Sequence, residues 1–142
     1  MFYIEECKVT LLNDRTYQVT YLGENILLKY ETEPSQGDEI YSVYFPKLKK
    51  IFPYWCYLRN IMQISIDESP ESLYLSIEAV KSHQWSGIVN IIIDPKNSRY
   101  ACLEDWYPCI KVEGNTIHFY NKYTRNEYIL KDFKELNWLS IC

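Results

Sequence analysis

Hydrophobic and polar side chains alternate along the N-terminal third of the chain. Tyr17, Val19 and Tyr21 share one face of an extended segment, and Gln18 and Thr20 lie on the other. Such period-2 alternation between short turns is typical of β-hairpins. The pattern predicts an antiparallel meander with strands over residues 2–12, 16–22, 26–31 and 40–45, turns at 13–15 and 23–25, and a loop at 32–39.

Strand patterns also occupy the second half of the chain. Residues 88–93 are almost continuously β-branched, which is typical of a strand buried on both faces. Residues 94–98 contain Pro after Asp and predict a turn. Further strands are predicted over residues 99–103, 110–112, 116–120 and 127–130.

Two segments have helical spacing. Pro53 suits the first position of a helix, and the residues that would then share one face are Tyr54, Leu58, Ile61 and Met62. We therefore expect a short helix over residues 53–62. A second is expected over residues 131–139, where apolar side chains recur near helical spacing at Phe133, Leu136 and Leu139.

Residues 72–80 fit both a helix and a strand. Ser69 and Pro70 would suit the start of a helix. The alternative strand has more matches, because apolar side chains recur at every second position, at Leu73, Leu75, Ile77 and Ala79. We favour the strand.

Length and composition place these elements in one domain, residues 1–142, because a domain commonly has roughly 100–200 residues. The predicted fold class is α+β, predominantly antiparallel β in hairpins and a meander, with one to three short helices. The composition is unusual in having 14 Tyr and 4 Trp but only 4 Gly. Tyr and Trp are enriched both in strands and at protein interfaces.

The net charge of −4 restricts the partners. Nucleic-acid binding needs clustered Lys and Arg, and the only basic cluster is Lys47, Lys49 and Lys50. An acidic chain instead favours a basic protein partner. The N-terminus does not resemble a signal or transit peptide, and no apolar run is long enough to span a membrane. Five scattered cysteines predict reduced thiols. We therefore expect a cytoplasmic protein that binds neither nucleic acid nor a membrane.

Candidate chemistry is sparse. Neither the cysteines nor His83 and His118 lie at metal-ligand spacing, so we expect no metal. Cys102 precedes two acids, which would oppose thiolate formation, and Cys56 has only Arg59 nearby in the sequence. The acidic pairs fall in predicted turns, and the glycines do not form a phosphate loop. The sequence predicts no catalytic residue and no cofactor.

The stretch YACLEDWYPC, residues 100–109, combines two acids with two large aromatic residues. Glu104, Asp105, Trp106 and Tyr107 precede Pro108, which favours extended backbone and would present the aromatic rings on a loop. Trp and Tyr are enriched among the residues that dominate binding energy at interfaces. We predict a partner-binding surface at this loop, with a second aromatic cluster at Tyr54 and Trp55. The alternative is a Trp106 that packs under the loop as a structural residue.

These observations favour a non-enzymatic protein-binding module. The profile of a small, acidic, aromatic-rich chain resembles that of bacterial immunity or antitoxin proteins. The resemblance implies a toxin inhibitor that covers the active cleft of a basic toxin such as a nuclease. Two alternatives remain open. One is a β-barrel whose Tyr-rich meander lines a small-ligand cavity. The other is a cysteine- or carboxylate-dependent enzyme, which would need a thiol or acid within hydrogen-bond reach of a histidine.

Overall fold

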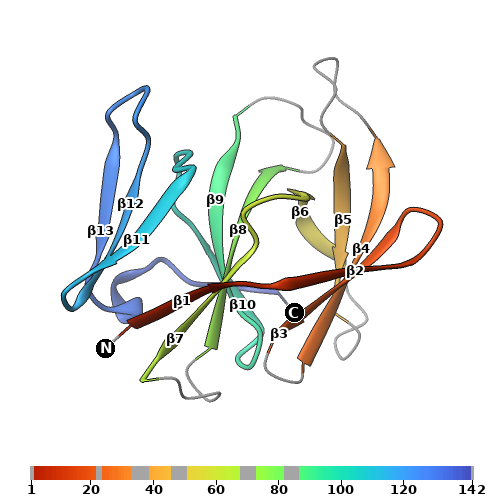
Figure 1. Ribbon diagram of the computed structural model, residues 1–142, viewed down its shortest axis with the longest axis horizontal. Helices are drawn as coiled ribbons and strands as arrows, with labels where there is room; N and C mark the ends of the chain where they lie inside the picture. Colours follow the sequence, from red (N-terminus) through yellow and green to blue (C-terminus); the bar gives the residue numbers. More distant parts are fainter. Residues whose placement is uncertain are drawn as a thin grey trace.

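The computed structural model describes residues 2–21, 24–32, 39–45, 51–67, 73–81 and 87–141. These residues form two antiparallel sheets (Figure 1). The larger sheet contains β1 (Phe2–Glu6), β2 (Lys8–Asn13), β3 (Thr16–Tyr21), β4 (Glu24–Thr32), β5 (Ile40–Tyr44), β6 (Ile51–Tyr57), β7 (Met62–Ile66), β8 (Leu73–Lys81), β9 (Val89–Asp94), β10 (Arg99–Cys102) and β14 (Leu139–Ser140). The smaller sheet contains β11 (Cys109–Glu113), β12 (Thr116–Tyr120) and β13 (Glu127–Leu130).

The predicted meander is present, since β2, β3, β4, β5 and β6 are neighbours in sequence order. The larger sheet continues from β6 through β8, β9, β10 and β14. Strand β7 pairs with β8 on one side and with β1 on the other. Because β1 runs directly into β2, the strand pairings return to the start of the meander and close the sheet on itself. Figure 1 shows β1 and β2 as one long strand that crosses the other strands.

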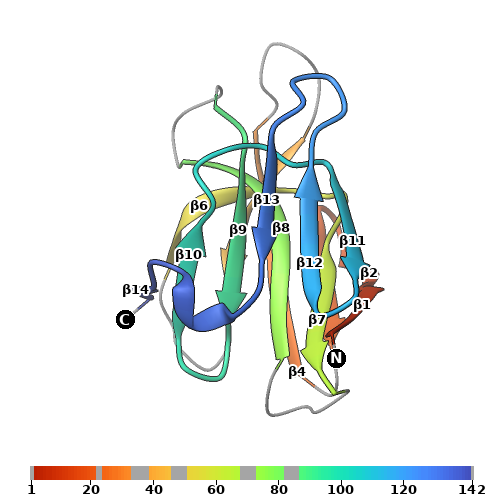
Figure 2. The same cartoon turned by 90° about the vertical axis from the view of Figure 1, so that its left-hand side faces the viewer.

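The buried side chains form three clusters that follow the alternation of the strands. Ile91 and Ile93 of β9 point into the first cluster, within the larger sheet, whereas Ile92 points into the second. The second cluster lies between the two sheets, and Figure 2 shows β11–β13 in front of β8 and β9. The third is a small group around Trp55. Strand β9 is therefore buried on both faces, as its β-branched sequence predicted.

The predicted α+β class is wrong, because strands make up 65% of the structure and helical residues only 3%. Residues 53–57, expected as the start of a helix, belong to β6. Phe52, Tyr54 and Cys56 contact the first cluster, while Trp55 lies in the third. With apolar partners on both faces, the strand buries more surface than a one-sided helix would. Pro53 lies where the register between β5 and β6 shifts, opposite Ser42 to Tyr44. At this position the missing N–H of proline does not remove a regular hydrogen bond between the two strands.

The second expected helix, over residues 131–139, is reduced to the single 3-10 turn η2 (Phe133–Glu135). Its Phe133 ring stacks on Tyr74 at 3.7 Å between centroids, and the Trp138 indole donates a 2.8 Å hydrogen bond to the Phe133 carbonyl. These contacts bury the apolar side chains of the segment without a longer helix, and Leu139 begins β14. Residues 73–81 are strand β8, which confirms the strand interpretation of that segment. Ser69 and Pro70 lie outside the described residues.

Candidate binding surface

The loop between β10 and β11, residues 103–108, is fastened to the larger sheet by Asn90. The Asn90 backbone N–H donates to the Asp105 carbonyl at 2.9 Å, and its carbonyl accepts the Leu103 N–H at 2.9 Å. The Asn90 side-chain amide also forms two hydrogen bonds with the Tyr107 backbone. It accepts the Tyr107 N–H at 2.6 Å and donates to the Tyr107 carbonyl at 2.9 Å. Asn90 is buried, so all four hydrogen bonds are shielded from water. The loop is a structural connection between the two sheets.

Tyr107, one of the predicted contact residues, lies in the second core cluster. Only 6% of its surface is exposed, and its ring packs edge-on against Phe119 at 6.4 Å between centroids. Burial, reinforced by the nearby Asp105 carboxylate, raises the pKa of the Tyr107 hydroxyl. Tyr107 is inaccessible to a partner unless the loop unfolds.

Trp106 is half-buried and bound through its indole. The indole N–H donates a 2.9 Å hydrogen bond to Glu78, a residue of β8 that is 1% exposed. The Arg59 Nε donates to the same Glu78 oxygen at 3.0 Å, and Asn60 donates to the other oxygen. The Arg59 guanidinium also lies 6.0 Å from the Trp106 ring. Trp106 therefore supplies a hydrogen bond to a buried carboxylate whose charge Arg59 balances, which agrees with the structural alternative for this residue.

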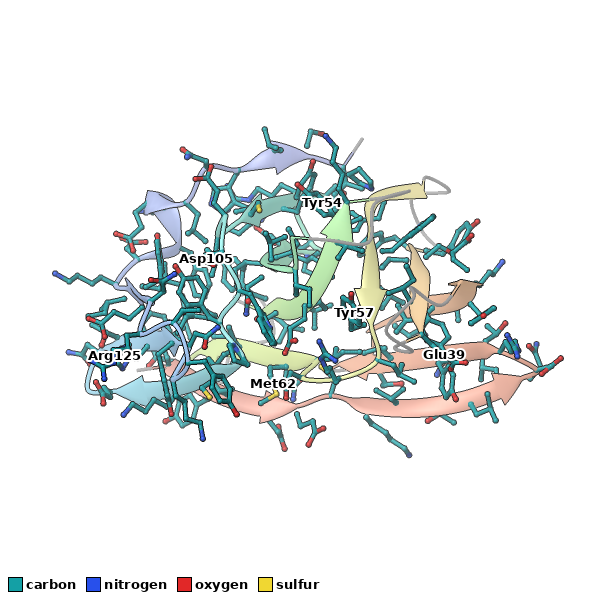
Figure 3. The ribbon with its side chains drawn as sticks, turned by 90° about the horizontal axis from the view of Figure 1, so that it is seen from above. Glu39, Tyr54, Tyr57, Met62, Asp105 and Arg125 are labelled. Carbon is teal, nitrogen blue, oxygen red and sulfur yellow. The ribbon has the colours of Figure 1, made fainter. Side chains whose placement is uncertain are left out.

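The acidic pair of the loop divides into one free and one bound carboxylate. Glu104 is exposed at the loop apex, in a left-handed backbone conformation with φ 65°. Asp105 is half-buried, accepts the Trp106 backbone N–H at 2.8 Å, and accepts a hydrogen bond from the Asn126 amide. Asp105 thus links this loop to the turn between β12 and β13. Figure 3 shows Asp105 and Arg125, from that turn, on the same side of the molecule.

Tyr54 and Trp55, the second predicted cluster, face opposite sides of β6. Tyr54 packs against Phe52 and Tyr100 at the first core cluster, and burial and the nearby Cys102 raise the pKa of its hydroxyl to about 12. Trp55 is buried in the third cluster. Of the six predicted residues, Tyr54, Trp55 and Tyr107 therefore pack in three different clusters, and the other three belong to none of these clusters.

The sequence predicted a turn at residues 121–126 but did not single out Tyr123, which this turn presents to solvent. Tyr123 is 85% exposed, the largest value among the exposed large hydrophobic residues of the described chain. The turn beneath it is rigidly bonded: the buried Asn121 side chain accepts the N–H groups of Tyr123 and Thr124 and donates to the Trp106 carbonyl. Its backbone carbonyl accepts the Arg125 N–H at 2.8 Å. The sequence signal that could have identified Tyr123 is an aromatic residue between polar residues in a turn.

We call loops 103–107 and 121–126 together the loop surface. Its accessible groups are Glu104, part of Trp106, and Tyr123 with its neighbours Lys122 and Arg125. Charges of both signs are present, so the loop surface is mixed and not acidic as the first loop alone suggested. Figure 2 shows both loops at the same end of the two sheets.

Two of the described thiols, Cys7 and Cys56, are buried. Burial, with help from Glu5 and Glu6, raises the pKa of Cys7 to about 12. Burial and the nearby Glu78 raise the pKa of Cys56, which donates to the Tyr57 carbonyl. The four cysteines among the described residues are free, and Cys142 lies outside them. No cluster of three metal-binding side chains occurs in the described part of the chain.

Of the two histidines and the remaining acidic pairs, the structure describes His118, Glu39 and Asp67. His118, on the outer face of β12, binds Glu127 at 2.9 Å through Nε2 and lies 3.6 Å from Glu113 through Nδ1. The Tyr41 hydroxyl donates to Glu39 at 2.8 Å. His83, Asp38, Glu68 and the basic cluster at Lys47, Lys49 and Lys50 lie outside the described residues.

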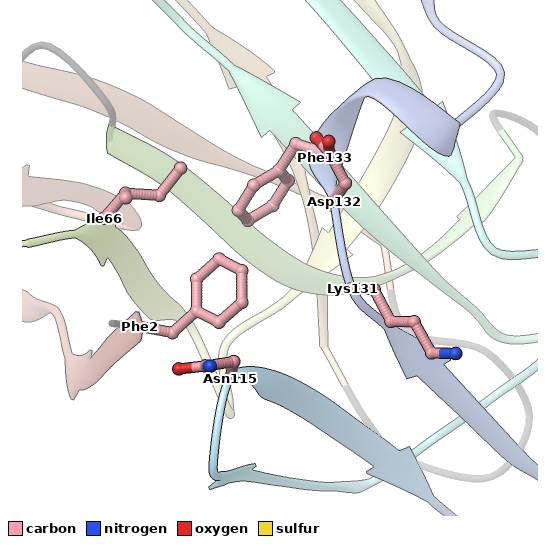
Figure 4. Close-up of a pocket in the computed structure, with 6 residues that line it drawn as sticks. All are labelled: Phe2, Ile66, Asn115, Lys131, Asp132 and Phe133. Atoms are coloured by element: carbon pink, nitrogen blue, oxygen red, sulfur yellow. The ribbon is translucent and has the colours of Figure 1, made fainter.

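A surface depression of about 300 Å³ opens beside η2. Figure 4 shows the rings of Phe2 and Phe133 turned toward each other across it, while the Lys131 ammonium group extends away. This depression lies outside the meander. Inside the meander, Tyr41 packs edge-on against Tyr17 and Tyr30, with ring centroids 5.5 and 6.0 Å apart, and all three rings pack at the first core cluster.

Comparison of this chain with protein families, with curated proteins and with solved structures gave no match. Among the described residues, no helix has the length and apolar character that crossing a membrane requires.

Proposed function

We propose that this chain is a non-enzymatic protein-binding module whose partner is a basic protein, and that it contacts this partner through the loop surface. In the finer form of the proposal it is an immunity- or antitoxin-type protein that inhibits a basic toxin such as a nuclease. The observation that carries the proposal is Tyr123, a tyrosine 85% exposed on a turn that is fully hydrogen-bonded beneath it.

The order of this turn favours binding. An interface that freezes a mobile loop loses about 0.5–1.5 kcal/mol for each side chain it immobilises. The Asn121 side chain already holds the backbone N–H groups of Tyr123 and Thr124, and Asp105 holds the Asn126 side chain, so the turn is ordered before a partner binds. Tyrosine supplies a large contact area with only two side-chain torsions.

The charge distribution supports a basic partner at long range. The net charge of −4 attracts a positively charged protein at distances where individual contacts do not matter. At the loop surface itself, Glu104 is the exposed carboxylate and Lys122 and Arg125 are the exposed cations. We therefore expect charge to govern the association rate and Tyr123 to govern the lifetime of the complex.

The test begins with capture of a protein by the immobilised full chain and continues with binding kinetics. Tyr123→Ala should weaken binding by about 2 kcal/mol or more, roughly thirtyfold in Kd, mainly through faster dissociation. Glu104→Lys should slow association of a basic partner, by a factor that shrinks as salt is added. Leu139→Ala, at another exposed apolar side chain away from both loops, is the matched control and should bind as wild type.

Two results would contradict the proposal. A folded Tyr123→Ala chain with unchanged kinetics would exclude the loop surface, and a captured partner that is acidic would exclude the charge argument. Trp106→Ala is a poor probe, because it also removes the hydrogen bond to the buried Glu78.

A further inference from the structure

Strand β2 is exposed along its whole length. All six of its residues are exposed, including Val9 at 38%, Leu11 at 58% and Leu12 at 49%. Its pairing with β3 is the only one it makes among the described strands, so one edge carries backbone groups without a described partner. Natural sheets usually cover or shorten such an edge, because its free N–H and C=O groups can pair with another chain.

The open edge begins where β7 leaves its neighbour. Strand β1 pairs with β7 up to Glu6 and Met62, and the Cys7 N–H then donates to the Ile61 carbonyl at 2.9 Å. After that bond the neighbouring chain departs, since Asn60 has φ 51° and Arg59 turns toward Glu78. The position beside β2 that would continue β7 is unfilled by any described strand.

The direction of the Cys7 bond identifies which groups of β2 face this position. Backbone N–H groups alternate between the two edges of a strand. Since the Cys7 N–H points toward Ile61, those of Val9 and Leu11 point toward the open edge, and that of Thr10 points toward β3. Val9 and Leu11 also lie opposite Val19 and Tyr17, so their side chains extend the face that carries the first core cluster.

Charged residues bracket this apolar edge. Glu6 precedes it and Asp14 follows it, both exposed, while Lys8 is its one cation. Arg15 is next to Asp14 and partly offsets its charge, while its guanidinium also lies 4.1 Å from the centre of the Tyr30 ring. An extended segment with apolar residues at alternate positions and basic residues at its ends is complementary to this edge.

We propose that β2 binds an extended segment of another protein, which has alternating apolar residues and basic ends and adds to the sheet as an antiparallel strand. This goes beyond the proposed function, since β2 and the loop surface are different regions. Figure 1 places the β2–β3 turn and strand β13 at opposite ends of the long axis.

A second copy of this chain suits the edge less well. Each copy carries a net charge of −4. Two β2 strands paired symmetrically about Thr10 would set Glu6 against Asp14, which is a like-charge pair. Symmetry about Leu11 would set Lys8 against Asp14, but that register runs through the irregularity between Leu11 and Asn13.

The test uses the ¹⁵N-labelled full chain and a capped peptide, Lys-Lys-Val-Thr-Val-Thr-Val-Lys-Lys, with amide hydrogen exchange followed by NMR. With the peptide at about ten times its Kd, exchange at Val9 and Leu11 should slow about tenfold. Exchange at Thr10 should stay slow throughout, because its N–H faces β3. Asp14→Asn should weaken peptide binding by a factor that shrinks with added salt.

Two modified peptides isolate strand addition from unspecific adhesion. N-methylation of the three valines removes the N–H groups that would face β2 and should abolish protection, whereas N-methylation of the threonines should leave it. Equal binding of both would overturn the proposal, as would spectral changes confined to other residues. Slow exchange at Val9 and Leu11 without peptide would also overturn it. In that case dependence on protein concentration would identify a second copy as the occupant, and independence would show that the chain covers its own edge.

Discussion

The loop from Leu103 to Tyr107 and the strand β2 reverse the roles that their sequences suggest. The loop has adjacent acids and two large aromatic residues, yet Asn90 holds it by four hydrogen bonds and Tyr107 lies in the core. Strand β2 has the ordinary composition of a meander strand, yet all its residues are exposed. The difference shows that exposure follows from the partners that the backbone finds, and residue type alone does not determine it.

The largest effect should come from a pair of matched tyrosines. Tyr107→Ala removes a side chain from the second core cluster and should reduce the free energy of unfolding by about 3–5 kcal/mol. Tyr123→Ala should change it by less than about 0.5 kcal/mol, because that ring is exposed. Urea denaturation followed by circular dichroism measures both. Equal losses would show that the loop is not anchored as described.

Asn90→Ala tests the anchor itself. It leaves the Tyr107 N–H and C=O without their partner, and each unsatisfied buried group costs about 1–3 kcal/mol, so a loss of at least about 2 kcal/mol is expected. Asn137→Ala, at an exposed asparagine, is the control and should be close to neutral. Denaturation midpoints of the two variants and wild type give the comparison. A neutral Asn90→Ala would mean that water replaces the amide.

Trp106→Phe tests how much the hydrogen bond from the Trp106 indole to Glu78 contributes to stability. Loss of a hydrogen bond to a charged group should reduce the free energy of unfolding by about 1.5–3 kcal/mol. In a double-mutant cycle with Glu78→Gln, the two effects should not add, because they share one contact. Strict additivity would indicate that Trp106 contributes through packing alone.

The smallest expected effect concerns the junction between β1 and β2, where Cys7 is buried. Its pKa is raised to about 12 in the fold from 9.0, so the folded chain retains the thiol proton that the unfolded chain loses above pH 9. The stabilisation is complete below pH 9 and declines toward pH 12. From pH 8 to pH 10, wild type should lose about 1 kcal/mol more than Cys7→Ala. Urea denaturation in a reducing agent at both pH values measures the difference, and parallel pH profiles would indicate an accessible thiol.

Much of the strand content could be predicted from local pattern. The two predicted helices were wrong, and the contacts around Trp106 and Tyr107 could not be predicted. Alternation identified the strand at residues 73–81 against a competing helix signal, because four of its apolar residues share one face. The same reasoning was wrong for residues 53–57. Their apolar side chains recur at helical spacing by coincidence, and in the structure the side chains on both faces of β6 are buried in hydrophobic clusters. The contact between Trp106 and Glu78 joins residues 28 positions apart, so no local pattern could place that indole.

Local sequence patterns predict most of the strands and turns, although β6 was predicted as a helix. Arg15, Ser98 and Gly114 lie in turns between strands and adopt positive φ, which only glycine adopts without strain, and β9 is buried on both faces as its isoleucines predict. Which strand keeps an open edge, and which loop is held by hydrogen bonds, depends on contacts between distant parts of the chain. The physical reason is the separation along the chain of the residues involved. Side-chain alternation depends on neighbouring residues. The burial of Tyr107 and the exposure of Leu11 depend on whether distant strands such as β9 or β7 lie beside them.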